Sequence, residues 1–384
     1  MPAVPEGVYR DRTRGTWYFK ATLGRDATAG HRSQVTRRGF QTAAEAAKAR
    51  RELLAKVDAG EVRANRSALT VAALLDEYLD GLDADRRLSA RTRFDHRARV
   101  EAHVRPHLGS FRIQDLTPEV LLGWQRALAH GDGQGKGLAP NTIRLVRQPL
   151  KGVLDLAVKR GLMIRSPLEE VPHPHIPRSI PKHWSPEQAR EFLALMEGDR
   201  TWPIWAFLLG TGLRVGEVVW LRWPCVDLER GELAVVEFAS RVGTRLEPSR
   251  GKSINAVRTV ALDSSLISVL GEQQKVQVAD RERAEEKYLE SDFVFTQSRG
   301  GPYHPVHLSK LVARYSDDVG LPRLSAHGLR HTAATLMLAS GVPPKVAAER
   351  LGHANSVLFS NLYAHVTPSM QRDAAEAVGR VLFG

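Results

Sequence analysis

The sequence predicts a multidomain α+β protein in three parts: a small three-stranded sheet plus one helix, an all-α domain, and a mostly α domain with a small antiparallel sheet. The chain has 384 residues, more than the roughly 250 to 300 at which a single hydrophobic core stops growing. β-Branched and aromatic residues alternate near the N-terminus and again at residues 233–262, whereas most of the remainder shows helical periodicity between capping residues.

Residues 1–62 are expected to form the first domain. Three strands are predicted, at residues 7–10, 16–21 and 34–40. Thr42 and Glu45 form a capping-box pattern, which predicts a helix that runs to about Asp58. The region is strongly basic, because residues 1–66 hold an excess of seven basic over acidic side chains out of a net charge of +12.

Residues 67–170 read as helices without a strand. Four helices are expected, beginning near Thr70, Ser89, Thr117 and Pro140. The second helix is expected to end near His103, and Pro149 is expected to kink the fourth. Six arginines lie in or just before the second helix: Arg86, Arg87, Arg91, Arg93, Arg97 and Arg99.

Four prolines stiffen residues 171–184, which predicts an extended linker. The last domain, residues 185–384, begins with an N-cap serine and a proline in the first helical turn. Helices are expected through Leu221, a small sheet at residues 233–262, and further helices to the C-terminus. Two of those helices are predicted at residues 326–340 and at residues 343–352.

Composition indicates the kind of partner and the compartment. The net charge of +12 and the pI near 10.0 favour a polyanionic partner, nucleic acid first, over a merely soluble basic protein. Cys225 is the only cysteine, which suits a reducing compartment. The longest apolar run, residues 202–213, is too short to cross a bilayer, and no signal core precedes it. We therefore expect a soluble, cytoplasmic protein without a membrane partner.

The densest group of chemically active side chains lies at residues 325–365. His327 and Arg330 are three residues apart on a predicted helix, so both project from one face and can reach the same ligand. His353 follows the next helix, and Tyr363 comes ten residues later. Two imidazoles, a guanidinium and a phenol around one point suggest phosphate chemistry.

Other chemistries fit the sequence less well, and each of these residues taken alone is ordinarily a packing or surface residue. His327 and His331 have metal-ligand spacing, but Gly328 stands where a zinc protease needs Glu, and one cysteine gives no thiolate cluster. Residues 251–253 read Gly-Lys-Ser, yet the glycine that a phosphate-binding loop needs five residues earlier is Leu246. We therefore expect no metal and no cofactor.

Four motifs occur in a fixed order along the chain. They are TGLRVGE at residues 211–217, HGLRHT at 327–332, LGH at 351–353 and YAH at 363–365. Together they closely resemble the signature of the tyrosine recombinases, the phage integrase family, and Lys252 stands where that family carries a catalytic lysine. The match covers about half of the chain. Many members place the tyrosine nine residues after the last histidine, but integrases of conjugative elements also use ten, so the resemblance implies a three-domain integrase of a phage or conjugative element.

The resemblance implies cleavage and rejoining of DNA by six catalytic residues: Arg214, Lys252, His327, Arg330, His353 and Tyr363. Tyr363 would attack phosphorus, leaving a 3′-phosphotyrosyl link and a free 5′-hydroxyl, which keeps the phosphodiester energy without ATP. Arg214 and Arg330 would hold the non-bridging oxygens. His327 would act as the base. His353 would bond to the phosphate, Lys252 would protonate the leaving oxygen, and Glu217 is expected to be structural.

The same resemblance implies a role for each domain. Residues 1–62 would bind arm sites by placing the sheet in the major groove, with Trp17 and one neighbour in the domain core. The side chains expected at this surface are Arg10, Arg12, Arg14, Trp17, Tyr18 and Lys20. Residues 67–170 would be the core-binding domain, whose arginines singly suit a solvated helix face and together suit phosphate contacts. Residues 171–184 would be the linker, and residues 185–384 the catalytic domain.

The expected partner is double-stranded DNA, at core and arm attachment sites, in a bacterial cytoplasm. Recombination of two duplexes needs four active subunits, so a homotetramer on DNA is expected, and an excisionase or a DNA-bending host factor is a further candidate partner. A type IB topoisomerase would share the catalytic set but lack arm contacts. A non-catalytic DNA-binding regulator would not need all six side chains. Strand exchange between two marked duplexes separates these three hypotheses.

Overall fold

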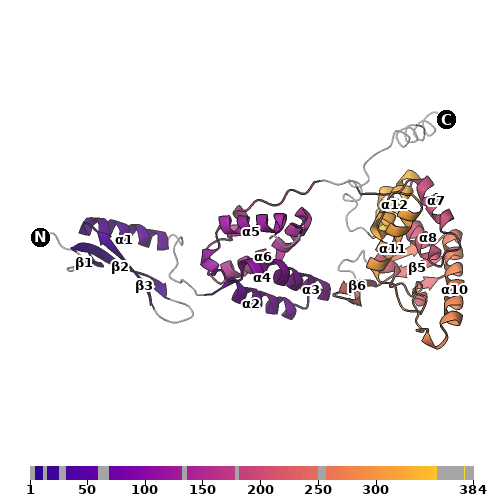
Figure 1. The fold of residues 1–384 in the computed structure, drawn as a ribbon, viewed down its shortest axis with the longest axis horizontal. Coiled ribbons are helices and arrows are strands. Elements are labelled where there is room, and N and C mark those ends of the chain that lie inside the picture. Colours follow the sequence, from indigo (N-terminus) through magenta and orange to yellow (C-terminus); the bar gives the residue numbers. More distant parts are fainter. Residues whose placement is uncertain are drawn as a thin grey trace. The chain divides into compact units, whose positions relative to one another are not determined.

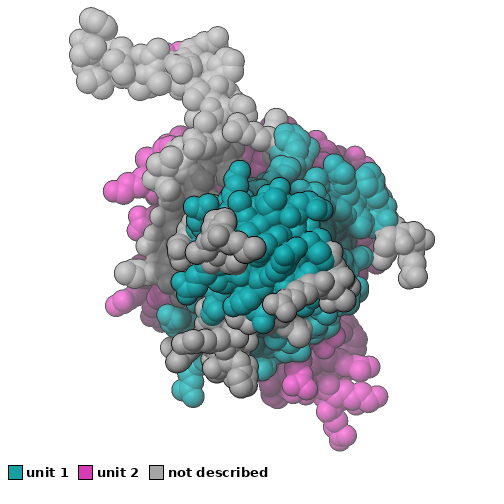
Figure 2. Space-filling model, turned by 90° about the vertical axis from the view of Figure 1, so that its left-hand side faces the viewer, with its two compact units in different colours: residues 1–177 teal, residues 178–384 magenta. Residues whose placement is uncertain are grey.

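The computed structural model groups the chain into two compact units, residues 1–177 and 178–384 (Figure 1) (Figure 2). The residues that the structure describes are 5–11, 15–25, 32–58, 69–131, 136–177, 181–249, 257–352 and 376. The division falls within the predicted linker at residues 171–184. The predicted boundary between residues 62 and 67 lies outside the described residues. The four domain boundaries therefore stay predictions.

The N-terminal part of the first unit is an antiparallel sheet in the order β1-β2-β3, with helix α1 packed against it (Figure 1). The bounds are β1 Val8–Asp11, β2 Thr16–Arg25, β3 Arg32–Phe40 and α1 Ala43–Asp58. The predicted capping box is present: the Thr42 hydroxyl accepts from the Glu45 N–H at 3.2 Å, and the Glu45 carboxylate accepts from the Thr42 N–H at 3.3 Å. The three strands and the helix are thus confirmed.

The two faces of this sheet differ, because successive side chains of a strand point to opposite sides. Phe19 is fully buried and Trp17 is half-buried against the same small core. On the opposite face the rings of Tyr9 and Tyr18 stack with centroids 5.3 Å apart, and the Arg38 guanidinium lies 5.1 Å from the Tyr18 ring centre. The face away from the core is therefore aromatic and basic.

The second part of this unit consists of helices and their connecting loops, with an isolated β-bridge between Thr70 and Arg112. The helices are α2 Val71–Ala84, α3 Ala90–Arg99, α4 Arg105–Leu108, α5 Pro118–His130 and α6 Pro140–Lys159. The second predicted helix does not end near His103 as expected. It passes through a π-helical turn at Val100–Val104 into α4. Pro106 has no N–H to continue the regular ladder of hydrogen bonds, which is a physical reason for the wide turn there.

Most arginines of this second helix lie beside carboxylates. The ion pairs are Arg87–Asp85 at 2.9 Å, Arg91–Asp95 at 2.7 Å, Arg97–Asp83 at 2.6 Å and Arg99–Asp95 at 3.9 Å. Exposed pairs of this kind contribute little to stability, because water and salt screen them. They also leave this surface less positive than the number of arginines implies.

The second unit is mixed, with more helix than strand. Its helices are α7 Pro186–Leu195, α8 Trp202–Thr211, α9 Val215–Val218, α10 Ser264–Ala284, α11 Pro305–Asp318, α12 Ala326–Ala339 and α13 Pro344–Leu351. Its strands are β4 Val226–Asp227, β5 Glu232–Val235, β6 Phe238–Val242, β7 Arg245–Ser249 and β8 Arg258–Ala261. The predicted α+β class is confirmed. The single predicted sheet is instead a sheet of order β4-β5-β8 and a separate β6-β7 hairpin.

The long apolar run of the sequence forms α8, which lies in the core of this unit. Trp205 and Phe207 of α8 are fully buried and pack in one cluster with Trp184, Phe192 and Phe295. Among the described residues, no helix is long and apolar enough to span a membrane. The core thereby fixes the ends of α8 and of its neighbour α12, and the candidate site lies at those ends.

Candidate active site

Arg214 is held at the N-terminus of α9 by a carboxylate three residues later. Helix α8 ends at Gly212, whose φ of +66° is the left-handed conformation that glycine adopts readily. Arg214 then occupies the N-cap position of α9, where its backbone N–H donates to Glu217 at 2.8 Å and its guanidinium donates to the other oxygen of Glu217 at 2.9 Å. The Arg214 side chain remains 43% exposed. Glu217 therefore holds the backbone and the guanidinium of Arg214, while part of the side chain stays accessible to a ligand.

Helix α12 presents His327 and Arg330, and the Ser325 hydroxyl caps its N-terminus by accepting from the Gly328 N–H at 3.3 Å. Arg330 is only 2% exposed. Its two terminal nitrogens donate to Gly212 O at 3.0 Å and to Leu351 O at 2.8 Å, so one guanidinium joins the ends of α8 and α13. The pair that the spacing on α12 predicted is thus brought next to the loop that carries Arg214.

Three consecutive carbonyl groups at the end of α13 each accept a hydrogen bond from a different arginine. Arg258 Nε donates to Arg350 O at 2.9 Å, Arg330 to Leu351 O at 2.8 Å, and Arg214 to Gly352 O at 2.9 Å. The last carbonyls of a helix have no intrahelical partners and carry its negative dipole end, so cations suit them. The helix end therefore gathers three guanidinium groups at one place.

Glu217 is the carboxylate that partly balances these charges. It is 5% exposed, and it also receives two hydrogen bonds from Arg258, at 3.1 and 3.0 Å. Burial by itself would raise the pKa of Glu217, but the hydrogen bonds and charges of Arg258 and Arg214 lower it below its ordinary value. Three guanidiniums facing one ionised carboxylate leave a net positive site, which suits an anion such as a phosphate group.

The imidazole of His327 lies in the same electric field. Partial burial, and then the charges of Arg330 and Arg214, lower the pKa of His327 from its ordinary value. Its ring meets that of His331 edge-on, with centroids 4.6 Å apart, and the pKa of His331 is lowered to about 4. Both rings are therefore neutral near pH 7, so His327 can accept a proton.

Of the six predicted catalytic residues, the structure brings Arg214, His327 and Arg330 together. Lys252, His353 and Tyr363 lie outside the described residues, and their roles stay predictions. The described chain next to them is informative: β7 and β8 flank the segment with Lys252, and Gly352, which directly precedes His353, accepts from Arg214. Within the described residues no group of three or more His, Cys, Asp or Glu could hold a metal ion.

Sequence reasoning missed one residue of this site, Arg258, and did not name the partners of another, Glu217. Glu217 was expected to be structural, and the structure shows it holding Arg214 directly. A Glu three residues after the N-cap can accept from the N-cap N–H, as the Glu of a capping box does, and this spacing could have revealed the contact. Arg258 appeared only as part of a strand. Its partner Glu217 is 41 residues away, and no local pattern reports so distant a contact.

Comparison with known proteins gives a consistent result. Residues 184–370 match the profile of the phage integrase family, and residues 8–57 match an arm DNA-binding domain. A tyrosine recombinase XerC-like protein of Caldanaerobacter subterraneus is 27% identical over 73% of this chain and 76% of its own length. The ICEBs1 integrase of Bacillus subtilis is 23% identical over 96% of this chain and 98% of its own length.

Solved structures show the same fold. The Tn1549 transposon integrase bound to transposon right end DNA superposes with a TM-score of 0.65 at 21% identity, covering 81% of this chain and all of that one. A lambda integrase tetramer bound to a Holliday junction superposes with a TM-score of 0.57 at 17% identity, covering 94% of this chain and 96% of that one.

Proposed function

The chain belongs to the phage integrase family of tyrosine recombinases, and we propose that it is the integrase of a mobile element whose catalytic residues are Arg214, Lys252, His327, Arg330, His353 and Tyr363. The observation that carries the assignment of these residues is the convergence of Arg214 and Arg330 on the carbonyls that directly precede His353. Topoisomerase activity alone and a non-catalytic regulator are the disfavoured alternatives.

The arginines suit the charge that develops on a phosphodiester under attack. Its non-bridging oxygens gain negative charge in the transition state, and guanidinium groups fixed in advance stabilise that charge without reorganising. Arg214 is anchored through Glu217 while its side chain stays 43% exposed. Arg330 is buried and immobilised by two carbonyls. We propose that Arg214 makes the main direct contact with the non-bridging oxygens of the phosphate and that Arg330 makes a second one.

The lowered pKa of His327 leaves its imidazole neutral and able to accept a proton in the first step. Neutral His327 takes the phenolic proton as the Tyr363 oxygen forms its bond to phosphorus, and the bond from phosphorus to the 5′-oxygen breaks. Lys252 gives a proton to that leaving oxygen, and His353 bonds to the phosphate. Attack by the free 5′-hydroxyl of a second strand reverses these steps, so the joining requires no external energy source.

DNA is the proposed partner of both units. The aromatic and basic face of the β1-β2-β3 sheet offers Tyr18 and Lys20 to arm sites, where a small sheet fits the major groove. Arg10 lies beside Trp17 on the other face of the sheet. Arg12 and Arg14, also predicted at this surface, lie outside the described residues. The helices of residues 67–170 would contact core-site phosphates. Two duplexes exchange strands in the reaction, so we propose a tetramer on DNA, assisted by an excisionase or a DNA-bending host factor.

The test uses Tyr363→Phe and a plasmid that carries the DNA flanking the gene. The wild-type protein should form an adduct with this DNA that survives denaturant, whereas the variant should retain binding and form none, because only the nucleophilic oxygen is lost. Gel shift measures binding and denaturing electrophoresis measures the adduct. A denaturant-stable adduct in the Tyr363→Phe protein would overturn the assignment of the nucleophile.

A further inference from the structure

Arg258 is a buried arginine that contacts two segments distant from it in the sequence. Its side chain is 7% exposed. From strand β8 it donates two hydrogen bonds to Glu217 of α9, at 3.1 and 3.0 Å, and one to Arg350 O at the end of α13, at 2.9 Å. One side chain thereby joins three elements: β8, which follows the Lys252 segment; α9, which begins after Arg214; and α13, which precedes His353.

Arg258 and Arg214 share one carboxylate. The first oxygen of Glu217 accepts from the guanidinium of each arginine, and the second accepts from the Arg214 backbone N–H and from Arg258. Four donors thus fix the rotation and position of this carboxylate. Removing two of them frees Glu217 to turn, and the exposed end of Arg214 would turn with it.

The path of the chain toward His353 also passes over Arg258. Gly352 has a φ of +68°, and a Cβ atom added to it would stand 2.8 Å from Arg258 Cζ. Only glycine allows both the left-handed turn and this close approach. The position of the Arg258 guanidinium therefore determines where the backbone of Gly352 lies at the end of α13. Because Gly352 O accepts a hydrogen bond from Arg214, it also affects the position of Arg214.

We propose that Arg258 is a positioning residue for the strand-cleavage step: it holds Glu217 and the end of α13 so that Arg214 meets the non-bridging oxygen of the scissile phosphate. Arg258 acts through Arg214 and does not itself touch DNA. This inference rests on the proposed function. It predicts that a change at Arg258 impairs catalysis only where Arg214 has a negative oxygen to hold.

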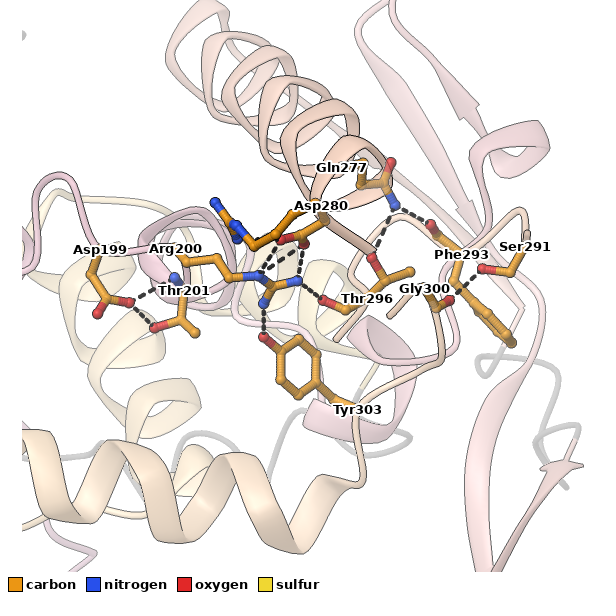
Figure 3. A network of polar contacts seen from close by, with 11 residues as sticks. Asp199, Arg200, Thr201, Gln277, Asp280, Ser291, Phe293, Thr296, Gly300 and Tyr303 are labelled. Carbon is orange, nitrogen blue, oxygen red and sulfur yellow. Dashed lines mark hydrogen bonds and ion pairs between the residues drawn. The ribbon is translucent and has the colours of Figure 1, made fainter. Parts of the chain in front are cut away.

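The experiment compares Arg258→Lys with a matched control, Arg200→Lys, in the full-length protein. Arg200 is also an arginine that pairs with a buried carboxylate in the same unit, Asp280. Its other hydrogen bonds within the described residues go to Tyr303 and Thr296, which are not among the proposed site residues (Figure 3). Each protein is given two duplexes made from the DNA flanking the gene. One carries an ordinary phosphate at the cleavage position mapped with wild type, and the other an uncharged methylphosphonate. The rate of covalent adduct formation and the melting temperature are measured for each.

On the ordinary phosphate, Arg258→Lys should slow adduct formation by roughly 10²-fold, the size of loss that a misplacement of about 1 Å can cause. On the methylphosphonate, this variant should approach the wild-type rate, because the charge that Arg214 would hold is absent. Arg200→Lys should lower the melting temperature and keep the wild-type ratio between the two substrates. Glu217→Gln, which can accept through one oxygen only, should reproduce the behaviour of Arg258→Lys and serves if that variant does not fold.

Three results decide the matter. Equal defects of Arg258→Lys and Glu217→Gln on both substrates would mean that the pair only stabilises the fold, and the inference would be overturned. Wild-type rates in both variants would overturn it as well. Failure of the wild-type protein to form an adduct with either duplex would instead contradict the proposed function, so the two failures are distinguishable.

Discussion

Among the described residues of the second unit, two carboxylates each hold two arginines, and the two clusters use these arginines differently. Asp280 is 1% exposed and pairs with Arg200 and with Arg283. Glu217 is 5% exposed and pairs with Arg258 and with Arg214. In each cluster one arginine is more buried and the other is more exposed. The chemistry of the two clusters is the same, so their difference lies in how the exposed arginine is fixed.

Figure 3 shows the Asp280 cluster, in which Arg200 bonds to Asp280, Thr296 and Tyr303. Arg200 donates to Asp280, to the Tyr303 hydroxyl at 2.6 Å and to Thr296 O at 2.8 Å, which ties α10 to the loop before α11. Arg283 is 71% exposed and makes a single 3.3 Å contact with Asp280. Arg214, in contrast, has its backbone N–H and two guanidinium nitrogens bound while 43% of its side chain is exposed. An arginine that is both anchored and accessible is prepared for an anion, whereas Arg283 is merely solvated.

The largest effect on stability should come from disrupting the Asp280 cluster. Arg200→Ala leaves the buried Asp280 with one weak partner, and removing one member of a buried ion pair typically costs about 3 to 5 kcal/mol. Arg283→Ala should cost less than about 1 kcal/mol, because the lost contact is exposed. Unfolding by denaturant measures both. Similar losses for the two variants would show that the comparison between buried and exposed partners does not hold.

Local elements of this fold were predictable, because their causes lie within a few residues. Thr70, Ser185 and Thr117 were recognised as N-caps, and each hydroxyl accepts from a backbone N–H three residues later. Glycine at position 352 was recognised as the end of a helix, and it has the left-handed φ that stops α13. The motifs at Arg214 and Arg330 likewise named two residues that the structure brings together.

The parts that sequence reasoning missed depend on contacts between distant segments. Among the described residues, β6 and β7 pair with each other, whereas β5 pairs with β8, which follows them in the sequence. The alternation of residue types does not indicate which strands pair. Arg258 reads as one of many arginines until Glu217 and Arg350 are seen against it. The sequence therefore predicted several of the residues that form the site. It did not predict the network of contacts that orients them.

The next effect separates the two exposed arginines by activity. Arg214→Ala should slow covalent adduct formation by about 10²- to 10³-fold, the usual cost of one lost donor to a charged transition state. Arg283→Ala should leave the rate unchanged, although it removes the same group from an equivalent pair. The adduct assay on DNA flanking the gene measures both, with the circular dichroism spectrum as the check that each variant is folded. A comparable loss in Arg283→Ala would mean that exposure and charge alone, without anchoring, account for the rate.

The smallest effect is the dependence of stability on acid. The folded-state pKa of Glu217 lies below its ordinary value, so this carboxylate stabilises the fold above its unfolded pKa, and the stabilisation is lost as pH falls through the folded value. Gln cannot titrate, so the difference in unfolding free energy between wild type and Glu217→Gln should shrink on acidification, by at most about 1.4 kcal/mol per pH unit for one proton. His331 takes up a proton less readily in the folded protein, so it destabilises the fold as pH falls from 6.5, its ordinary pKa, to about 4, its lowered value. It is present in both proteins and cancels in the difference. Denaturant unfolding at a series of pH values from neutrality to the acid limit of folding measures this difference. A difference that stays constant with pH would mean that the ionised form of Glu217 is not what holds Arg258 and Arg214.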